Sequence, residues 1–222
     1  MLNFEDLRFI TTADGSHTLY VPELDEPYHS IHGAIQESKY IFIEQGLKMC
    51  RKNFIQALEI GFGTGLNALL TALEADRNKK RIHYTTLERY PISLQNARLL
   101  NYQALLENSG NVFERIHEAA WETDVEINPF FVLYKTKIDF VTCTLTGMYD
   151  VIYFDAFSPN TQPEMWTESC FAKIAAHCYP DAVLTTYCVK GTVRRALQKT
   201  GFKVVRLPGP KGKREILRGE RI

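Results

Sequence analysis

An acid and an aromatic residue directly follow one of the most apolar stretches of the chain. The stretch YDVIYFDAFSP starts at Tyr149, reads as a buried strand, and ends by presenting Asp155 and Phe157. In open parallel sheets, ligands bind beyond the carboxyl ends of the strands, so Asp155 is a candidate to face a ligand. For Phe157, and for Trp166 in the helix expected next, packing in the core is the alternative interpretation.

A glycine-rich loop lies between the first strand of the expected core and the helix after it. In LEIGFGTGLN, Gly61, Gly63 and Gly65 let the chain turn tightly and let a ligand touch the backbone. Glu88 ends the next strand, where its carboxylate would accept hydrogen bonds from both hydroxyls of a ribose and would repel a 2′-phosphate. The strand, loop, helix and closing acid together predict a nucleoside-cofactor site, whereas glycines alone would also suit a structural turn.

The residues around this loop distinguish between two nucleoside cofactors. A dinucleotide fingerprint has a third glycine three residues after the second, and here that position is Leu66. Glu59, two residues before Gly61, would repel a pyrophosphate but suits a cation. S-adenosylmethionine has no phosphate and carries an ammonium and a sulfonium group, so Glu59 and Asp155 favour it over NAD. For Glu59, the alternative is a hydrogen-bond acceptor in the loop or at the helix N-terminus.

The elements that must position these residues alternate between strands and helices. A hairpin pattern surrounds Asp14-Gly15 near the N-terminus. Strands are expected at 54–60, 82–88, 149–156, 182–188, 202–207 and 214–220, with two more runs forming a hairpin within 129–143. Helices are expected at 33–49, 66–76, 91–106, 163–177 and 191–200. This alternation predicts an α/β fold whose parallel sheet is covered on both faces and ends in an antiparallel hairpin.

Composition narrows the class of protein. The 222 residues are 45% apolar and 23% charged, which fits one ordinary globular domain. No apolar run approaches the ~20 residues that span a bilayer, and the start MLNFEDLRFI is too acidic for a signal peptide. The five cysteines show no C-x-x-C spacing and the histidines no ligand spacing, so we expect reduced thiols in a cytoplasmic protein without a metal.

Charge is unevenly distributed although the net charge is zero. Residues 190–222 hold eleven Lys or Arg against two acids, and the rest of the chain carries a net charge of −9. A basic C-terminal segment suits contact with a polyanion, and a solvated lysine-rich tail is the alternative.

Two of these stretches are similar to a known family. EIGFGTGLN together with FDAFSPNTQPEMWT resembles the methyltransferase half of the bifunctional tRNA-modifying MnmC proteins and their stand-alone MnmD form, and the likeness extends over most of the chain. The resemblance implies a Rossmann-like fold with a mostly parallel seven-stranded sheet and an antiparallel edge hairpin. It places a methyltransferase domain at 51–222 and a small N-terminal β/α extension or lid at 1–50, in a single domain overall.

The resemblance also implies an activity. Such proteins use S-adenosylmethionine to methylate the 5-aminomethyl group of a wobble (2-thio)uridine in tRNA, giving 5-methylaminomethyl-(2-thio)uridine. Asp155 would orient the amine nitrogen and accept its proton, and Phe157 would either stack on the base or enclose the methyl group. The bifunctional members add an FAD oxidase domain, for which this chain has no room. We therefore expect methyl transfer alone, with the tRNA anticodon loop as partner, no membrane, and a separate oxidase as a conceivable further partner.

The family pattern assigns further site residues by position. Those matching its cofactor loop, ribose acid and lid are Tyr28, Tyr40, Glu59, Gly61, Phe62, Gly63, Thr64, Gly65, Asn67 and Glu88. Family members commonly carry Gly-Asp after the third core strand, where the acid meets the adenine amino group. Here the aligned pair is Cys143-Thr144, so Thr144 would take that place as a weaker acceptor.

An anticodon loop also needs cations for its flanking phosphates. The candidates for substrate binding are Lys190, Arg194, Arg195, Lys211, Lys213 and Arg214. Scattered surface charges are the alternative interpretation of this set. His29 and His32 fall in the lid-like stretch, where a polar loop role competes with substrate contact.

Two other functions stay open. One is a methyltransferase or aminopropyltransferase-like enzyme acting on a small amine or a protein, because related chemistries share this sheet. The other is an inactive cofactor-binding scaffold that docks on an oxidase partner. An inactive scaffold would not need Asp155, and the chain has it.

Overall fold

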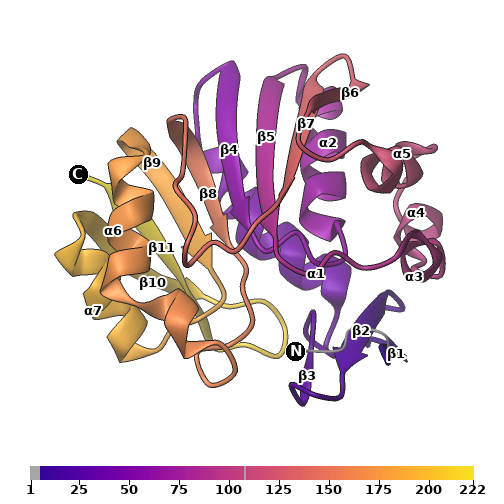
Figure 1. Ribbon diagram of the computed structural model, residues 1–222, viewed down its shortest axis with the longest axis horizontal. Helices are drawn as coiled ribbons and strands as arrows, with labels where there is room; N and C mark the ends of the chain where they lie inside the picture. The colour runs from indigo at the N-terminus through magenta and orange to yellow at the C-terminus, as the bar shows by residue number, and fades with distance from the viewer. Residues whose placement is uncertain (1–5, 108) are drawn as a thin grey trace.

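The computed structural model of the chain describes residues 6–107 and 109–222, and an eight-stranded sheet runs through its centre (Figure 1). The sheet has the order β10-β11-β9-β8-β4-β5-β7-β6. Its strands are β4 (Phe54–Ile60), β5 (Arg81–Glu88), β6 (Asp124–Asn128), β7 (Phe131–Lys137), β8 (Tyr149–Phe154), β9 (Cys178–Thr186), β10 (Phe202–Pro208) and β11 (Glu215–Arg221). The five strands from β9 to β7 are parallel, and β11 is antiparallel to both β9 and β10. The α/β class and the edge hairpin are confirmed, and the sheet has eight strands where the resemblance implied seven.

The hairpin predicted within 129–143 is wrong, because one of its two expected strands lies earlier in the chain, in β6. That run forms the single strand β7, which pairs antiparallel with β6, the segment before it. Asp139 ends the run, because its Oδ1 accepts a hydrogen bond from Val141 N and its carbonyl accepts one from Cys143 N, both over 2.9 Å. These bonds turn the chain into a loop in which a second strand cannot form.

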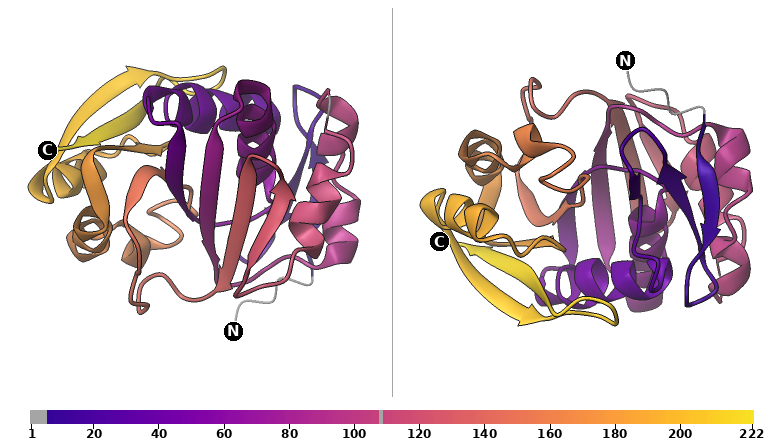
Figure 2. Two further views of the ribbon diagram at one scale, coloured as in Figure 1. Left: turned by 90° about the horizontal axis from the view of Figure 1, so that it is seen from above. Right: turned by 90° about the horizontal axis from the view of Figure 1, so that it is seen from below.

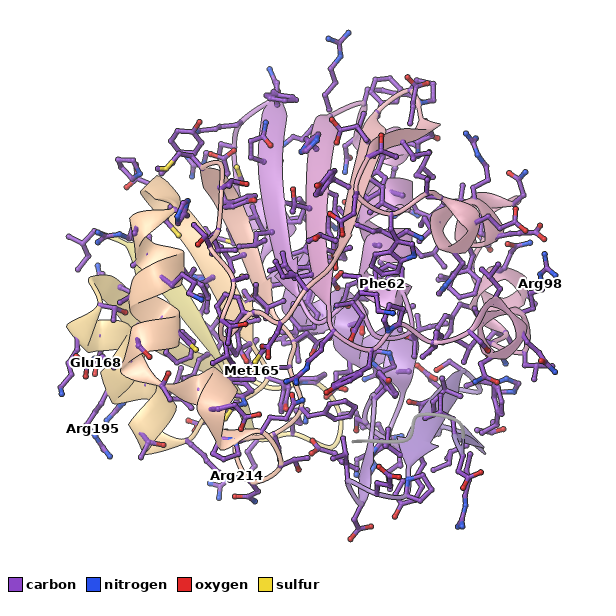
Figure 3. All side chains as sticks on the ribbon, in the orientation of Figure 1. Phe62, Arg98, Met165, Glu168, Arg195 and Arg214 are labelled. Atoms are coloured by element: carbon purple, nitrogen blue, oxygen red, sulfur yellow. The ribbon has the colours of Figure 1, made fainter. Side chains whose placement is uncertain are left out.

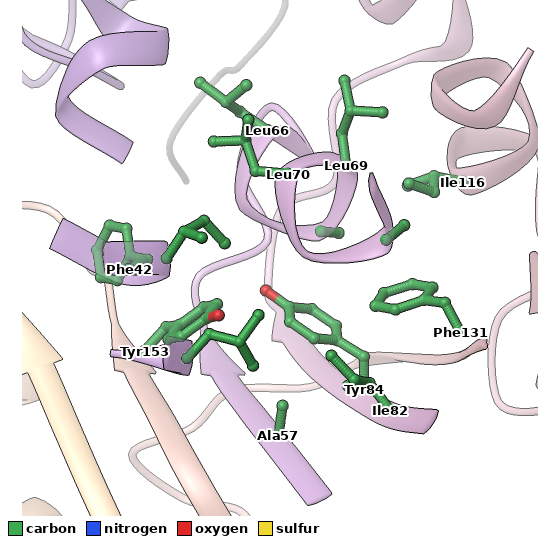
Figure 4. Packing of buried hydrophobic residues seen from close by; sticks show 14 of the residues in the cluster. Phe42, Ala57, Leu66, Leu69, Leu70, Ile82, Tyr84, Ile116, Phe131 and Tyr153 are labelled. Carbon is green, nitrogen blue, oxygen red and sulfur yellow. The ribbon is translucent and has the colours of Figure 1, made fainter. Parts of the chain in front are cut away.

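Helices cover both faces of the sheet, as the alternation of buried side chains requires. Along β8, Val151 and Tyr153 face one core, and Ile152 and Phe154 face the other. Helix α2 (Leu66–Asn78) closes the first core, where its leucines lie above the rings of Tyr84 and Tyr153 (Figure 4). Helices α6 (Glu168–Ala176) and α7 (Gly191–Lys199) contribute side chains to the second core.

The helix predicted over 91–106 is instead two short helices, α3 (Leu94–Arg98) and α4 (Tyr102–Leu105). Asn101 separates them, because its side chain bonds to the N-terminal hairpin: Oδ1 accepts from His17 N over 2.8 Å and Nδ2 donates to Gly15 O over 2.9 Å. A third short helix, α5 (Val112–Glu118), packs beside them.

Two other predicted helices are also divided. Residues 33–49 form α1 (Ala34–Ser38), a π-helix (Lys39–Glu44) and a 3₁₀ turn (Leu47–Met49). Residues 163–177 form a 3₁₀ turn (Pro163–Trp166) followed by α6. Extended backbone at Thr167 separates this pair, and its hydroxyl accepts a hydrogen bond from Cys170 N as an N-cap, so α6 starts anew.

The N-terminal segment forms a small antiparallel sheet of β1 (Arg8–Thr11), β2 (His17–Val21) and β3 (Glu26–Pro27). The predicted hairpin at Asp14-Gly15 is confirmed. This sheet lies beyond the carboxyl ends of the parallel strands (Figures 1 and 2). Leu19 and Ile41 join the same buried cluster as α2, so residues 6–50 share a core with the rest of the chain. The division at residue 50 stays a prediction, and residues 1–5 of the expected extension lie outside the described part.

Within residues 6–107 and 109–222, no helix is long and apolar enough to cross a membrane. All five cysteines are free and buried, which agrees with the expected reduced thiols in the core.

Candidate functional site

A cavity opens where three neighbouring parallel strands end. Strands β8, β4 and β5 lie side by side, and their ends stay connected: Asp155 N donates to Ile60 O, and Gly61 N donates to Leu87 O, both over 3.0 Å. The cavity holds about 1120 Å³ of space, part of it open to solvent. Of the predicted site residues, those that line it are Tyr28, Gly61, Gly63, Glu88, Asp155, Phe157 and Lys213. The sheet therefore brings the glycine loop, the two strand-end acids and the lip aromatic together.

The glycine loop lies against the backbone of the candidate catalytic acid. Gly61, Gly63 and Gly65 have φ values of 95°, 51° and 74°, a region that side chains strongly disfavour. A Cβ at Gly61 would lie 2.6 Å from the carbonyl oxygen of Asp155. A Cβ at Gly63 would lie 3.0 Å from the ring of Tyr28. Glycine is needed here both for the turn and for the close approach.

Asp155 is held by one strong polar contact at the cavity wall. Its Oδ2 accepts a hydrogen bond from Nδ2 of Asn67 over 2.8 Å. Burial raises the pKa of Asp155 to about 7, and the bond from Asn67 opposes that shift. A carboxyl group with this pKa exchanges a proton near neutral pH, which is what an acid or base catalyst requires.

Glu88 occupies the position expected of a ribose-binding acid. Its Oε2 accepts a hydrogen bond from Gly63 N over 2.9 Å, and its Oε1 accepts one from Tyr90 N over 2.7 Å. Burial raises its pKa, and these backbone bonds counteract the effect. A carboxylate has about four acceptor sites, so these bonds leave acceptor capacity for a ligand hydroxyl, and the carboxylate ties the glycine loop to β5 while it faces the cavity.

Glu59 does not face the cavity, which corrects the charge argument made for it. It is fully buried beneath α2, where its Oε2 accepts a hydrogen bond from the Thr86 hydroxyl over 2.7 Å. Burial raises its pKa to about 8, so it is mostly neutral at pH 7. The alternating side chains of β4 explain the placement, because Glu59 shares the α2 face with Ala57.

Thr144 does not line the cavity either, and its exposed position gives no support to the expected adenine contact. Asp139, which sequence reasoning missed, lines the cavity instead. It lies two residues after the end of β7, and its Oδ2 pairs with the Arg89 guanidinium over 2.9 Å. Its position as the first acid after the third core strand could have indicated Asp139. The incorrect hairpin prediction placed residue 139 inside a strand and so hid this position.

Aromatic side chains form the lip of the cavity. The rings of Tyr28 and Phe157 meet edge to face, with centroids 5.0 Å apart. The indole nitrogen of Trp166 donates to the Phe157 carbonyl over 2.8 Å, while the Trp166 side chain itself is buried. Phe157 therefore belongs to the cavity, and Trp166 belongs to the core, as the alternative interpretation held.

Glu26 is a second residue that lines the cavity and was not predicted from the sequence. Its carboxylate accepts hydrogen bonds from Ser158 N over 3.0 Å and from the Thr161 hydroxyl over 2.5 Å. These contacts join the N-terminal sheet to the loop after β8. No local pattern could have indicated them, since more than 130 residues separate the partners in the sequence.

The remaining loop and lid residues support the cavity from behind or from the side. Phe62 is buried against the rings of His117 and Trp121, and Gly65 lies under His117. The Thr64 hydroxyl bonds to His29 Nε2 over 2.7 Å in the interior. Tyr40 donates to the carbonyl of Pro208 over 2.9 Å. Of the predicted cofactor residues, Phe62, Thr64, Gly65, Asn67 and Tyr40 therefore do not line the cavity, and their contact with a cofactor stays a prediction.

The basic residues divide into two groups. Lys190, Arg195, Lys211 and Arg214 are exposed, and Arg194 is partly buried. Figure 3 shows Arg195 and Arg214 along the lower margin of the molecule, below α7 and beside the loop before β11. Lys213 instead points into the cavity and pairs with Glu37 over 3.1 Å. Among residues 6–107 and 109–222, no group of three or more His, Cys, Asp or Glu side chains is arranged to hold a metal ion.

Comparisons with known proteins identify the family of the chain. Residues 100–222 match the model of a family described as S-adenosyl-L-methionine-dependent methyltransferase. The tRNA 5-methylaminomethyl-2-thiouridine biosynthesis bifunctional protein MnmC of Aeromonas hydrophila is 30% identical over 220 residues, covering 90% of this chain and 33% of that protein. The MnmC of Marinobacter nauticus is 31% identical over 229 residues, covering 90% and 35%. The chain thus spans about a third of the length of these curated relatives.

Solved structures give the same relationship. The MnmC2 protein of Aquifex aeolicus superposes with a TM-score of 0.80 at 27% identity, covering 98% of this chain and 72% of that one. The spermidine synthase of Thermotoga maritima, at 12% identity and a TM-score of 0.61, covers 100% of this chain and 81% of its own and shows a shared fold alone. Because the family model matches more than half of its length, the chain belongs to the S-adenosyl-L-methionine-dependent methyltransferases and is a relative of the MnmC proteins.

Proposed function

We propose that the protein transfers a methyl group to the amine of 5-aminomethyl-(2-thio)uridine at the wobble position of tRNA, giving 5-methylaminomethyl-(2-thio)uridine. One observation carries the proposal: Asp155, held by Asn67, lines a cavity bounded by the glycine loop on one side and by Tyr28 and Phe157 on another. The names of the MnmC relatives supply the tRNA substrate class. We further propose that the protein acts in the cytoplasm, where tRNA is modified.

The residues of the cavity fit S-adenosyl-L-methionine. When bound, this cofactor supplies a methyl group on a sulfonium, which is open to attack by a nucleophile. Glu88 would accept hydrogen bonds from the ribose hydroxyls, and Asp139 would accept one from the adenine amino group. Gly61 and Gly63 leave room where a Cβ would clash with Asp155 or Tyr28, so a ligand can approach the backbone.

Asp155 prepares the amine. A primary alkylamine is mostly protonated at neutral pH, so it must lose a proton before its nitrogen lone pair can attack. With a pKa of about 7, the Asp155 carboxylate can hold the ammonium group and then take up that proton. The Asp155 carboxylate would take the ammonium proton first, which leaves the amine nitrogen with a lone pair for the methyl group that bound S-adenosyl-L-methionine would supply, with the thioether as the leaving group.

The aromatic lip would position the base. Stacking of a nucleobase on an aromatic side chain contributes about 1–3 kcal/mol. Phe157 is braced by Tyr28 and, through its carbonyl, by Trp166. These contacts fix the ring of Phe157, so its side chain loses little conformational entropy when a base binds.

The strand directions support a tRNA surface next to the cavity. Lys190 follows β9, and Lys211 and Arg214 lie between β10 and β11, all at the carboxyl edge of the sheet where the cavity opens. Arg194 and Arg195 follow in the first turns of α7. Cations at this edge would contact phosphates that flank a base inserted into the cavity.

Nucleoside mass spectrometry of tRNA tests the proposal. Two tRNA samples, one carrying 5-aminomethyl-(2-thio)uridine and one lacking it, are incubated with the protein and S-adenosyl-L-methionine. We expect 5-methylaminomethyl-(2-thio)uridine to form in the first sample only. Methyl transfer to tRNA without the aminomethyl group, or to free polyamines or protein in preference to the first sample, would contradict the proposed substrate. No transfer to any of them would favour a cofactor-binding scaffold, whose partner would then be an oxidase.

A further inference from the structure

Lys213 lies in the cavity, where sequence reasoning had expected an exposed phosphate-binding cation. Its Nζ is 3.1 Å from Oε1 of Glu37 and 4.8 Å from the centre of the Tyr187 ring. Its side chain is only 28% exposed, whereas its neighbour Arg214 is exposed to solvent. In the loop between β10 and β11, the side chain of Lys213 thus points into the cavity, and that of Arg214 points into solvent.

Glu37 is the second carboxylate on the cavity wall. It comes from α1 in the N-terminal segment, and its side chain is 11% exposed. Its Oε2 accepts a hydrogen bond from Ser30 N over 2.9 Å, which fixes the side chain. Apart from the ion pair with Lys213, its buried Oε1 accepts no hydrogen bond from the described residues. One oxygen is therefore anchored and the other is available to a cation.

The three charged groups act on one another. Glu37 and Asp155 line the same cavity, and Glu37 raises the pKa of Asp155 while Lys213 lowers it, both less than burial does. When both carboxyl groups are ionised, the two carboxylates carry one more negative charge than the Lys213 ammonium balances, so a second cation would neutralise the site. A buried carboxylate is unfavourable without a cationic partner, so a site with this composition attracts a cation.

The side chain of Lys213 ends in a primary alkylammonium, the same chemical group that an aminomethyl substituent presents. We propose that Glu37 and Asp155 together form a subsite for the primary ammonium of the substrate, and that Lys213 occupies part of this subsite until the substrate replaces it. This inference rests on the proposed function, because it assigns residues that recognise the amine of that substrate. Glu37 is thereby a binding residue, and Asp155 keeps the proton-accepting role.

Contacts between distant segments hold this arrangement in place. Glu37 belongs to the N-terminal segment and Lys213 to the last hairpin, and Tyr40 ties the two together through the carbonyl of Pro208. Because Tyr40 anchors the loop without Lys213, the lysine can leave Glu37 while the loop stays in position. Exchange of one ammonium for another requires only rotation of a side chain.

Binding of two synthetic anticodon stem–loops tests the inference. One carries 5-aminomethyluridine at the wobble position and the other carries uridine, and dissociation constants are measured by fluorescence anisotropy at one fixed salt concentration. The wild-type protein should bind the amine-bearing stem–loop more tightly, by about tenfold or more, as expected of hydrogen bonds to charged groups. Glu37→Gln should lose most of this preference while binding the uridine stem–loop within about twofold of wild type, because glutamine keeps the acceptor for Ser30 N.

Two further variants separate charge recognition from general effects. Glu44→Gln is the matched control, because Glu44 is a partly exposed acid of the same segment that pairs with Lys48 outside the cavity. It should keep the full preference. Lys213→Met should keep or increase the preference, since the competing ammonium is gone. An unchanged preference in Glu37→Gln, or a preference abolished in Lys213→Met, would overturn the inference.

The same stem–loops distinguish this inference from the proposed function. Methyl transfer to the amine-bearing stem–loop by the wild-type protein tests the function alone. If wild type transfers the methyl group and Glu37→Gln keeps the binding preference, only the subsite is wrong. If wild type binds both stem–loops equally and transfers nothing, the proposed substrate itself is wrong.

Discussion

The side-chain amide of Asn67 donates a hydrogen bond to Oδ2 of Asp155 over 2.8 Å. Asn67 lies in the first turn of α2, two residues after Gly65, so the segment that forms the glycine loop also supports the candidate catalytic acid. The bond favours the ionised form of Asp155, whereas burial favours the neutral form and raises the pKa to about 7. The balance between these two effects sets the pH at which Asp155 can accept a proton.

Replacement of Asn67 by alanine should therefore shift the pH dependence of the reaction. Without the donor, the neutral form of Asp155 becomes more favourable, so its pKa rises further, by about one unit for a hydrogen bond to a charged group. The pH at which kcat/KM reaches half of its maximum should move upward by the same amount. The measurement is kcat/KM for methyl transfer between about pH 6 and pH 9 in both proteins.

Thr71→Val is the matched control for this variant. Thr71 is buried one turn further along α2, and its hydroxyl donates to the Asn67 carbonyl over 2.7 Å and lies 3.2 Å from the Tyr153 hydroxyl; among the described residues it makes no hydrogen bond to Asp155. Its loss should affect stability without moving the pH profile. An upward shift of equal size in Thr71→Val would show that the helix, and not the Asn67 amide, controls the ionisation of Asp155.

Removal of the Asp155 carboxyl group should separate chemistry from cofactor binding. Asp155→Ala should lower kcat by about 10²–10⁴, the usual contribution of a positioned proton acceptor. The dissociation constant for S-adenosyl-L-methionine, measured by calorimetry, should stay within a few-fold, because Glu88 and Asp139 remain. Near-normal turnover in this variant would exclude the role assigned to Asp155.

The sequence was informative where the order of strands and helices alone determines the position of a residue. Gly61, Gly63 and Glu88 were predicted to bind the cofactor, and they line the cavity, because strand, loop and helix follow one another and the next strand ends beside them. Asp155 was predicted for the same reason, since the ends of adjacent parallel strands meet at one edge. Such placements depend on topology, which the alternation of elements reveals.

The sequence was not informative where the outcome depends on which way a side chain turns or on distant partners. Glu59 was expected to face the cavity, but the two-residue repeat of β4 directs it beneath α2. Lys213 was counted with its exposed neighbours, and its inward position depends on Glu37, which is more than 170 residues away. No local pattern records such pairs, so the arrangement at the amine end of the cavity required the structure.

The loop that carries Asp139 depends on a lysine from α6. Nζ of Lys173 donates to the carbonyls of Phe140, Val141 and Cys143 over 2.7, 3.0 and 2.7 Å. Lys173→Met keeps the aliphatic length and removes all three bonds. We expect it to weaken S-adenosyl-L-methionine binding by about tenfold, because three partly buried carbonyls lose a charged donor and the loop loses its fixed position. Calorimetric titration measures the change, and an unaltered affinity would show that the loop does not contribute to cofactor binding.

His29 should make the fold sensitive to acid. It is buried and bonded to the Thr64 hydroxyl over 2.7 Å, and burial lowers its pKa to about 4 from the ordinary value of 6.5. Because the unfolded chain binds this proton more readily, stability is complete above pH 6.5 and falls as the pH drops toward 4, by about 3 kcal/mol for this shift. His29→Gln lacks this group, so the stability difference between wild type and the variant should shrink over that range. Denaturation in urea at several pH values measures it, and a constant difference would contradict the assignment.

The basic residues at the carboxyl edge should make tRNA binding depend steeply on salt. Neutralising a phosphate releases counterions, so each lost contact should reduce the slope of log Kd against log salt by about 0.7 for a single-stranded loop. The double variant Lys190→Gln, Arg214→Gln removes two exposed cations from that edge and should reduce the slope by about 1.4. Lys203→Gln is the control, because Lys203 is exposed at the opposite end of β10, away from the cavity. Equal slopes in wild type and the double variant, or an equal reduction in the control, would show that the tRNA does not contact this edge.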